Sequence, residues 1–186
     1  GADAVKVGVG PGGACTTRMV TGFGVPQFTA IRSCGAVAKR FGVPMIADGG
    51  IRNSRDVSLA LAAGASTVMM GSIFCKTKES AGEKITVKQG DEEILCVKYR
   101  GQASADFQKD YYGKLKVGTV AEGVDGHMPI TGTAQEVIDQ LCGGLKSAYT
   151  YGGAKNIKEF QRKATFMKVT PNYLAESGPR LQRKIQ

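Results

Sequence analysis

The first 75 residues alternate between short apolar runs and longer amphipathic stretches. The apolar runs span residues 2–10, 43–51 and 66–74, and each contains or leads into glycine. Because nearly continuous apolar strands separated by helices are typical of βαβ units, this pattern predicts a parallel sheet that is buried on both faces. Ligands bind at the carboxyl edge of such sheets, which is where these glycines would lie.

Two helices are predicted between these strands. Residues 24–42 carry apolar side chains at helical spacing. Residues 54–65 predict a second helix, with Ser54 as its N-cap and Gly64 as its C-cap. The apolar positions of the first helix are Ile31, Cys34, Val37, Ala38 and Phe41.

The pattern changes after Lys76. Residues 83–101 alternate in polarity around a Gln-Gly-Asp turn, which predicts a β-hairpin. Residues 102–132 are polar and rich in glycine without a clean period, and we interpret them as a mobile loop. Residues 83–132 would then be a hairpin and flap inserted in the domain.

The C-terminal third predicts more helix. Residues 133–153 have a helical pattern that we expect to break or end near Gly143 and Gly144. Residues 156–170 predict a short helix followed by a strand-like end, and the basic tail after them is expected to be exposed.

Composition and charge narrow the class of protein. The 186 residues are 42% hydrophobic and 22% charged, which is typical of one globular domain. No apolar run approaches the roughly 20 residues that cross a bilayer, so we expect no membrane partner. The net charge of +9 favours anionic partners. Because the basic residues are spread along the chain without interleaved aromatic residues, nucleic acid is not the expected partner.

The five cysteines are widely spaced and form no CxxC pair, and His127 is the single histidine, so the sequence argues against a zinc site. With no export signal visible, reduced thiols and a cytoplasmic location are expected. We interpret four of the cysteines as small core residues: Cys34, Cys75, Cys96 and Cys142.

Cys15 differs from the others because of its neighbours. It lies in "GVGPGGACTTR", residues 8–18, where glycines permit positive φ angles and close approach to a ligand. Cysteine supplies a nucleophile, and backbone N–H groups near a helix N-terminus favour its thiolate form. The loop is thus a candidate phosphate cradle, a catalytic loop or both. The alternative is a buried cysteine in a tight turn.

Longer blocks carry a resemblance. "VKVGVGPGGACTTRMVTGFGVPQ" resembles the catalytic loop of the inosine monophosphate (IMP) dehydrogenase and guanosine monophosphate (GMP) reductase family. "IADGGIRNSRDVSLALAAGASTVMMGSIF" resembles that family's phosphate- and ribose-binding strands, in the same order and spacing. "KYRGQAS", "EGVDGHMP", "GGLKSAYTYGGAKNI" and "PNYLAES" extend the resemblance over roughly residues 1–178.

The family resemblance implies an α/β fold, the (β/α)8 TIM barrel. A complete barrel needs eight strands and about 250 residues. The chain has only three βα units and opens at Gly1 rather than at methionine, so we expect a fragment: the C-terminal portion of one catalytic domain, spanning residues 1–186. Such a fragment would lack part of the nucleotide pocket, and its exposed sheet edges would invite association.

The resemblance also implies roles for individual residues. Cys15 would form a covalent thioimidate at purine C2, and Thr17 would hydrogen-bond the reacting group. Asp48 would accept hydrogen bonds from both ribose hydroxyls, the alternative being a carboxylate that caps a strand end. The residues that match the phosphate cradle are Gly13, Gly49, Gly50, Gly71 and Ser72. The residues that match contacts to the phosphate and the base are Tyr99, Gly101, Gln102 and Ala103.

Glu122 and Gly123 match the residues that hold N1 and O6 of the purine, the alternative for Glu122 being an exposed loop position. The family further implies a potassium ion held by backbone carbonyls, and a homotetramer, because part of that cage comes from a neighbouring protomer. The matching positions are Gly10, Gly12 and Cys15 in one protomer and Glu176, Ser177 and Gly178 in the other.

Two activities share these residues. The dehydrogenase oxidises IMP with NAD and water to XMP, using an Arg-Tyr pair on a flap, whereas the reductase uses NADPH to convert GMP into IMP and ammonia with a glutamate after its "G-x-x-S" turn. Here that glutamate position is Ala105, with Asp106 one place beyond. Tyr111 or Tyr112 can serve as the flap tyrosine, but Lys109 is the nearest preceding cation, and lysine replaces arginine poorly.

The remaining blocks decide between the two activities. "DGGIR", "EGVDGHMP" and "PNYLAES" look more like the dehydrogenase, while "SAYTYGGAKNIKEF" looks more like the reductase. We therefore favour an NAD-dependent IMP dehydrogenase, with Tyr111 as the flap residue, over a GMP reductase. A non-catalytic nucleotide-binding domain or an inactive fragment is the alternative of another class.

Overall fold

The computed structural model describes residues 1–115 and 118–179. Its first sheet is parallel, in the order β1-β2-β3, with strands β1 (Val5–Val7), β2 (Met45–Asp48) and β3 (Thr67–Met69). The helices α2 (Gln27–Arg40) and α3 (Ser54–Ala62) connect these strands. The predicted βαβ units are therefore confirmed.

Burial differs between the centre and the edges of this sheet. In the central strand β2, Met45 and Ala47 are 1% and 0% exposed, and they form the core with residues of α2 and α3. At the edges, Val5 and Met69 are 36% and 50% exposed. The prediction of burial on both faces is therefore wrong for β1 and β3, because each of them has a neighbouring strand on one side only.

The ends of α3 differ from those predicted. The N-cap is Asn53 rather than Ser54, because the Asn53 side chain accepts a hydrogen bond from the backbone of Asp56. The C-cap is Ala63 rather than Gly64. Gly64 instead lies against Gly35 of α2, where an added Cβ would come within 3.3 Å of the Gly35 Cα.

The structure replaces part of the third predicted strand with helix. Strand β3 ends at Met69, and the short helix α4 (Ser72–Cys75) follows. Another short helix, α1 (Thr17–Thr21), begins just after Cys15.

A second sheet is antiparallel, with the order β4-β5-β6. Strands β4 (Lys84–Gln89) and β5 (Glu92–Arg100) confirm the predicted hairpin. The interpretation of 102–132 as a loop is wrong for α5 (Ala105–Tyr112) and β6 (Asp125–Pro129). The buried Ser104 hydroxyl caps α5 by accepting from Phe107 N, and Gly113 ends it in the left-handed conformation.

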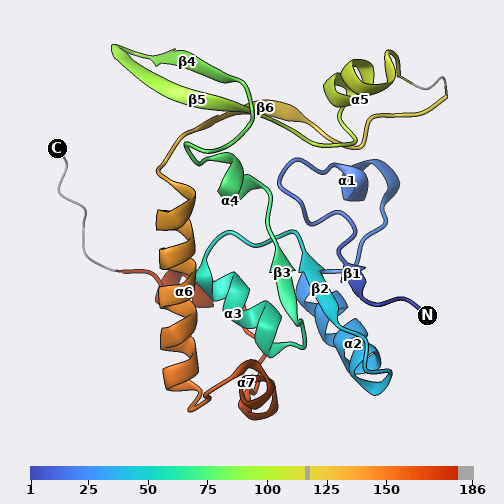
Figure 1. Cartoon of the computed structure of the whole chain (residues 1–186), viewed down its shortest axis with the longest axis vertical. Coiled ribbons are helices and arrows are strands. Elements are labelled where there is room, and N and C mark those ends of the chain that lie inside the picture. The colour runs from blue at the N-terminus through green and yellow to red at the C-terminus, as the bar shows by residue number, and fades with distance from the viewer. Residues whose placement is uncertain (116–117, 180–186) are drawn as a thin grey trace.

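Helix α6 (Ala134–Tyr151) runs unbroken through the glycine pair at 143 and 144. It starts in a capping box between Thr133 and Glu136. Gly144 permits close packing on α3 rather than a break, because a Cβ there would lie 2.1 Å from the Ser54 hydroxyl. Figure 1 shows α6 alongside α3, with the antiparallel sheet on the side of the molecule where α1 and α4 lie.

The C-terminal part also differs from the prediction. Helix α7 (Ile157–Lys163) is followed by irregular backbone rather than a strand, and Phe166 in that stretch packs edge-on against Phe28 at 4.9 Å. Helix α8 (Asn172–Glu176) lies in the tail that was expected only to be exposed. No helix in the part of the chain described here is long and apolar enough to cross a membrane.

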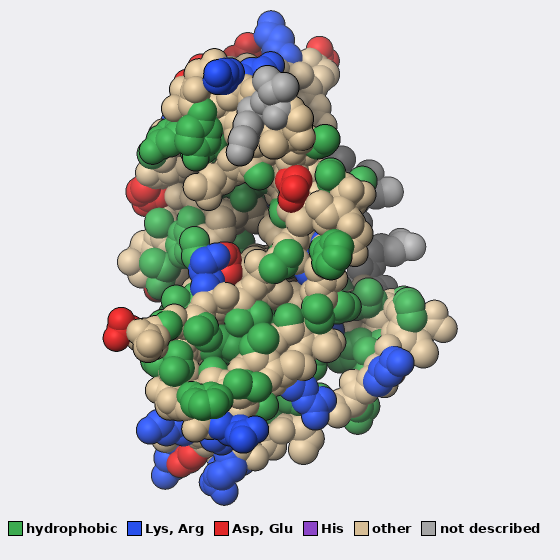
Figure 2. Space-filling model, turned by 90° about the vertical axis from the view of Figure 1, so that its right-hand side faces the viewer, with side chains coloured by type: hydrophobic (Ala, Val, Ile, Leu, Met, Phe, Trp, Pro, Cys, Tyr) green, Lys and Arg blue, Asp and Glu red, His purple; other side chains and the backbone are tan. Residues whose placement is uncertain are grey.

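The cysteines differ in burial, and one face of the molecule exposes apolar side chains. Only Cys96 of the four predicted core cysteines is buried, whereas Cys75 is half-buried and Cys34 and Cys142 are exposed. A broad band of hydrophobic side chains crosses the face that carries β1, α1 and α2 (Figure 2), and Met19 and Phe23 are among the exposed apolar residues. This face therefore exposes apolar surface beside a sheet edge that has no neighbouring strand.

Candidate functional site

The cysteine loop connects β1 to α1 and passes directly over the end of β2. At Gly8 an added Cβ would lie 2.0 Å from the backbone oxygen of Asp48, so only glycine allows this crossing. At Gly49 an added Cβ would lie 2.8 Å from the ring of Pro11. The loop and the two strand ends are consequently in contact along their backbones.

The Cys15 thiol is the first member of a hydrogen-bonded series. Its Sγ donates to the Thr17 hydroxyl at 3.2 Å, and that hydroxyl donates to Oε2 of Glu122 at 2.8 Å. All of these bonds are partly buried. A nucleophile, a hydroxyl and a carboxylate that are far apart in the sequence are thus connected by two hydrogen bonds.

Backbone hydrogen bonds fix this arrangement. The Thr16 N–H donates to the carbonyl of Glu122, and the Val124 N–H donates to the carbonyl of Ala14, both at 2.9 Å. The Glu122 N–H donates in turn to Ala103 O at 3.1 Å. Cys15 and Gly123 form an isolated antiparallel bridge. The segment after α5 therefore returns to the cysteine loop and is anchored there.

A cavity of about 320 Å³ opens between these elements. It collects residues from the cysteine loop, the end of β2, the end of β5 and the returning segment. The predicted site residues that line it are Gly10, Gly12, Cys15, Asp48, Gly49, Tyr99, Gly101, Gln102, Ala103, Glu122 and Gly123.

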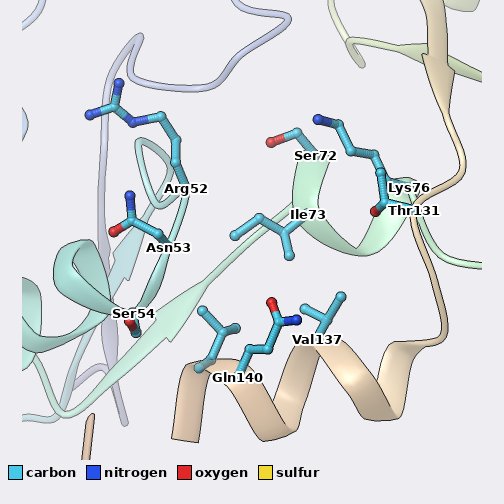
Figure 3. A pocket seen from close by; sticks show the side chains of 10 residues that line it. Arg52, Asn53, Ser54, Ser72, Ile73, Lys76, Thr131, Val137 and Gln140 are labelled. Atoms are coloured by element: carbon cyan, nitrogen blue, oxygen red, sulfur yellow. The ribbon is translucent and has the colours of Figure 1, made fainter. Parts of the chain in front are cut away.

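The proposed phosphate residues lie beside this cavity. Gly71 is next to the Tyr99 hydroxyl, which would be 3.0 Å from a Cβ at Gly71. Ser72 lines a neighbouring cavity (Figure 3). Gly13 and Gly50 do not line the Cys15 cavity, although Gly50 lies near Pro11 of the cysteine loop.

Tyr111 is not brought to the thiol. It lies on α5 with 71% of its surface exposed, and its ring stacks on Phe107 at 5.6 Å. Asp106 is also directed elsewhere, because it pairs with Lys98 at 2.9 Å and with Arg100 at 3.3 Å. These two cations hold the pKa of the Asp106 carboxyl below its usual value, with the Lys98 hydrogen bond as the largest cause.

The predicted C-terminal cation ligands are likewise separate from the cysteine loop within this chain. Glu176 ends α8, Ser177 and Gly178 follow it, and none of them lines the Cys15 cavity. Tyr173 of the same helix contacts Arg55 of α3 instead.

The sequence analysis missed Lys6, which forms an ion pair with the Asp48 carboxylate. The strands β1 and β2 run side by side, with Lys6 opposite Ile46. Gln27 adds to this junction, because its Nε2 donates to the carbonyls of both Val7 and Asp48. The one available signal was a lysine in the middle of an apolar strand.

Tyr99 is set up to donate a hydrogen bond. Burial raises the pKa of its phenol, and the charges of Cys75 and Asp48 raise it further. The hydroxyl thus stays protonated at neutral pH and can donate a hydrogen bond.

Comparisons with known proteins place this site in a family. The model of the IMP dehydrogenase / GMP reductase domain matches residues 1–180. The chain belongs to this family.

Individual relatives agree. The chain is 48% identical over 176 residues to an inosine-5'-monophosphate dehydrogenase of Aquifex aeolicus, covering 91% of this chain and 35% of that protein. It is 45% identical to the enzyme of that name from Cryptosporidium parvum, covering 95% of this chain and 45% of the relative. The chain thus spans between about a third and a half of the length of these curated relatives.

A solved structure shares the fold. A GMP reductase variant from Trypanosoma brucei, in complex with guanosine 5'-monophosphate, aligns with a TM-score of 0.90 at 42% identity. The alignment covers 98% of this chain and 37% of that one. The α/β fold of the family is therefore shared over nearly the whole chain.

Proposed function

We propose that this chain is part of a purine nucleotide oxidoreductase that converts IMP, NAD and water into XMP and NADH. The observation that carries the proposal is the series Cys15–Thr17–Glu122, which opens on a cavity lined by Asp48 and Tyr99. It joins a nucleophile, a path for its proton and groups suited to a sugar and a phosphate. The family relationship supplies the reaction class.

The chain's own residues perform the covalent steps. The Cys15 proton passes through the Thr17 hydroxyl to Glu122, and the thiolate adds to purine C2. The nicotinamide of NAD, when bound, supplies the acceptor for the hydride that leaves C2. Water then attacks the thioimidate at C2, the C–S bond breaks, XMP leaves, and the thiol regains a proton.

Substrate binding follows from the strand ends. Asp48, oriented by Lys6, accepts hydrogen bonds from the ribose hydroxyls. Tyr99 donates to the phosphate. The backbone groups proposed to join it are those of Gly13, Gly49, Gly50, Gly71 and Ser72, with the Ser72 hydroxyl.

The purine lies against the segment after β5. Gln102 and Ala103 line the cavity below the proposed base, beside Gly101 and Gly123. Oε2 of Glu122 accepts the hydrogen bond from the Thr17 hydroxyl. The other carboxylate oxygen of Glu122 is therefore the one that accepts a hydrogen bond from purine N1–H. Tyr111 reaches the site only if α5 moves, because it is exposed and stacked on Phe107 in this structure.

The architecture completes the proposal. We assign residues 1–186 to one catalytic domain, the C-terminal portion of a TIM barrel, with residues 83–132 as its hairpin and flap. The assembly is a homotetramer in the cytoplasm. For potassium, the fit is partial within one chain, since Gly10, Gly12 and Cys15 offer backbone carbonyls but the Gly12 carbonyl already accepts from Cys15 N. Glu176, Ser177 and Gly178 of a second protomer would complete the cage, and no catalytic step is assigned to the ion.

GMP reductase is the second candidate. It is supported by the 42% identity to a GMP reductase structure bound to guanosine 5'-monophosphate and by the lack of an arginine next to Tyr111. In that reaction the thiolate adds to C2 of GMP, and Glu122 returns a proton through Thr17 to the departing amine, which leaves as ammonia. Hydride from NADPH then reaches C2, the thiolate leaves, and IMP is formed.

One assay distinguishes the two candidates. The purified full-length protein is given IMP with NAD, or GMP with NADPH, and nicotinamide absorbance is followed in both. NADH production from IMP supports the dehydrogenase. NADPH consumption with release of ammonia, and no reaction with IMP, would replace it with the reductase.

A further inference from the structure

A second cavity, of about 340 Å³, is lined in part by Ser72, which does not line the Cys15 cavity. Side chains from three parts of the chain line it, among them Asn53, Ser72, Lys76 and Gln140. No aspartate or glutamate is among its lining residues in the described part of the chain. Hydroxyl, amide and ammonium groups without a carboxylate make a lining suited to an anion.

Lys76 is the uncompensated charge in this cavity. The other cation, Arg52, directs its backbone N–H and its Nε to the carboxylate of Asp56. Lys76 has no carboxylate partner among residues 1–115 and 118–179. Figure 3 shows its amine on the same side of α4 as the Ser72 hydroxyl, whereas the Arg52 guanidinium points away from both.

The backbone that carries Lys76 is firmly held. Its carbonyl accepts from Thr131 N at 2.9 Å, and Lys78 N donates to Gly132 O at 2.8 Å. The next residue, Thr77, is buried and bonds to the carbonyl of Phe74 through its hydroxyl. The ammonium is therefore presented from a fixed point beside Ser72.

We propose that Lys76 supplies the positive charge that binds the 5'-phosphate of the nucleotide. This inference rests on the proposed function, which places the phosphate at Gly71, Ser72 and Tyr99. Those groups donate hydrogen bonds but carry no positive charge, and a phosphate monoester is largely a dianion at neutral pH. Lys76 and Ser72 line the same cavity, so a phosphate that accepts from the Ser72 hydroxyl lies within reach of the Lys76 ammonium.

The test measures binding of nucleotides and of the corresponding nucleosides. With the purified full-length protein, calorimetry gives the Kd of IMP, GMP, inosine and guanosine. Lys76→Gln is expected to raise the Kd of both monophosphates about tenfold, the order of one charge-assisted hydrogen bond, and to leave the nucleosides unchanged. Lys76→Arg retains the charge and should restore most of the affinity.

Lys78→Gln is the matched control, because it removes the same charge only two residues along the chain. The Lys78 side chain is exposed and interacts electrostatically with Glu136. It should leave all four Kd values unchanged. The proposal is overturned if Lys76→Gln leaves monophosphate binding unchanged, weakens nucleosides equally, or if inorganic phosphate binds alongside IMP without competing. Tight, Lys76-dependent binding without turnover would sink the proposed function and leave this inference standing.

Discussion

The parallel sheet β1–β3 and the antiparallel sheet β4–β6 differ in what they bury and in what they bring to the site. The first has a core strand whose residues Met45 and Ala47 are almost inaccessible, and its ends supply Asp48 and the glycines. The second is largely exposed apart from Cys96 and Val97, yet it supplies Tyr99 and leads to Glu122. In the proposed site, the ribose-binding carboxylate of Asp48 therefore comes from the buried sheet, whereas Tyr99 and Glu122 come from the exposed sheet and the segment that follows it.

The cysteine loop joins these two regions, and we expect removal of its thiol to have the largest effect on activity. Cys15→Ala should lower kcat by roughly a thousandfold or more, because the covalent step is lost, while nucleotide binding persists. Steady-state assays and calorimetry measure the two effects. Cys34→Ala, which changes an exposed residue of α2, should leave both kcat and nucleotide binding unchanged. A Cys15→Ala protein that keeps normal turnover would reduce the loop to a phosphate cradle.

The next largest effect tests the contribution of the antiparallel region. Glu122→Gln should lower kcat by about a hundredfold, because the carboxylate no longer accepts the thiol proton through Thr17. The KM should change much less. Glu93→Gln on the exposed part of β5 should leave kcat unchanged. An equal loss for both variants would contradict the assigned proton path.

The difference in burial between the two sheets predicts different stability effects. Met45→Ala in the central parallel strand should lower the free energy of unfolding by about 3 kcal/mol, since it opens a cavity in the core. Leu95→Ala in β5, where the side chain is 50% exposed, should cost less than about 1 kcal/mol. Denaturant unfolding of the purified full-length variants compares them. Similar losses would show that the antiparallel sheet shares the same core.

The smallest effect concerns acid pH. Lys98 and Arg100 lower the folded-state pKa of Asp106 below its unfolded value, with the Lys98 hydrogen bond as the main cause. Its contribution is therefore present above the unfolded pKa and is lost as the pH falls through the folded pKa. Acidification should loosen the contact between α5 and β5 and leave the parallel sheet unchanged. An NMR titration of the carboxyl carbon should show a lowered midpoint that rises in Lys98→Met, and an unshifted midpoint would refute the pairing.

Local pattern was sufficient for the parallel region. Alternation of apolar runs with amphipathic stretches predicted β1, α2, β2, α3 and the start of β3, because each element is defined by neighbours in sequence. The errors there were small and had local causes. Asn53 caps α3 in place of the adjacent Ser54, and Gly64 serves a close contact with Gly35 rather than a helix end.

The antiparallel region was less accessible to sequence reasoning. Strand β6 has little apolar character of its own and is defined by its pairing with β5, which a sequence pattern does not reveal. The same holds for the site. The residue types at Cys15, Asp48 and Glu122 indicated chemistry, but the hydrogen bond from Thr17 to Glu122 and the ion pair from Lys6 to Asp48 join positions that are distant in the chain.

The hydrogen bond from Glu122 N to Ala103 O holds together the two ends of the segment between these residues. Ser104 is also bridged to Gly123, so the two ends of this segment meet at a fixed point beside Cys15. The cost of closing a loop grows by only about 0.6 kcal/mol for each doubling of its length. We therefore expect insertions and deletions between these two contacts to be tolerated. The sequence of this segment can then diverge among relatives while the position of the nucleophile stays the same.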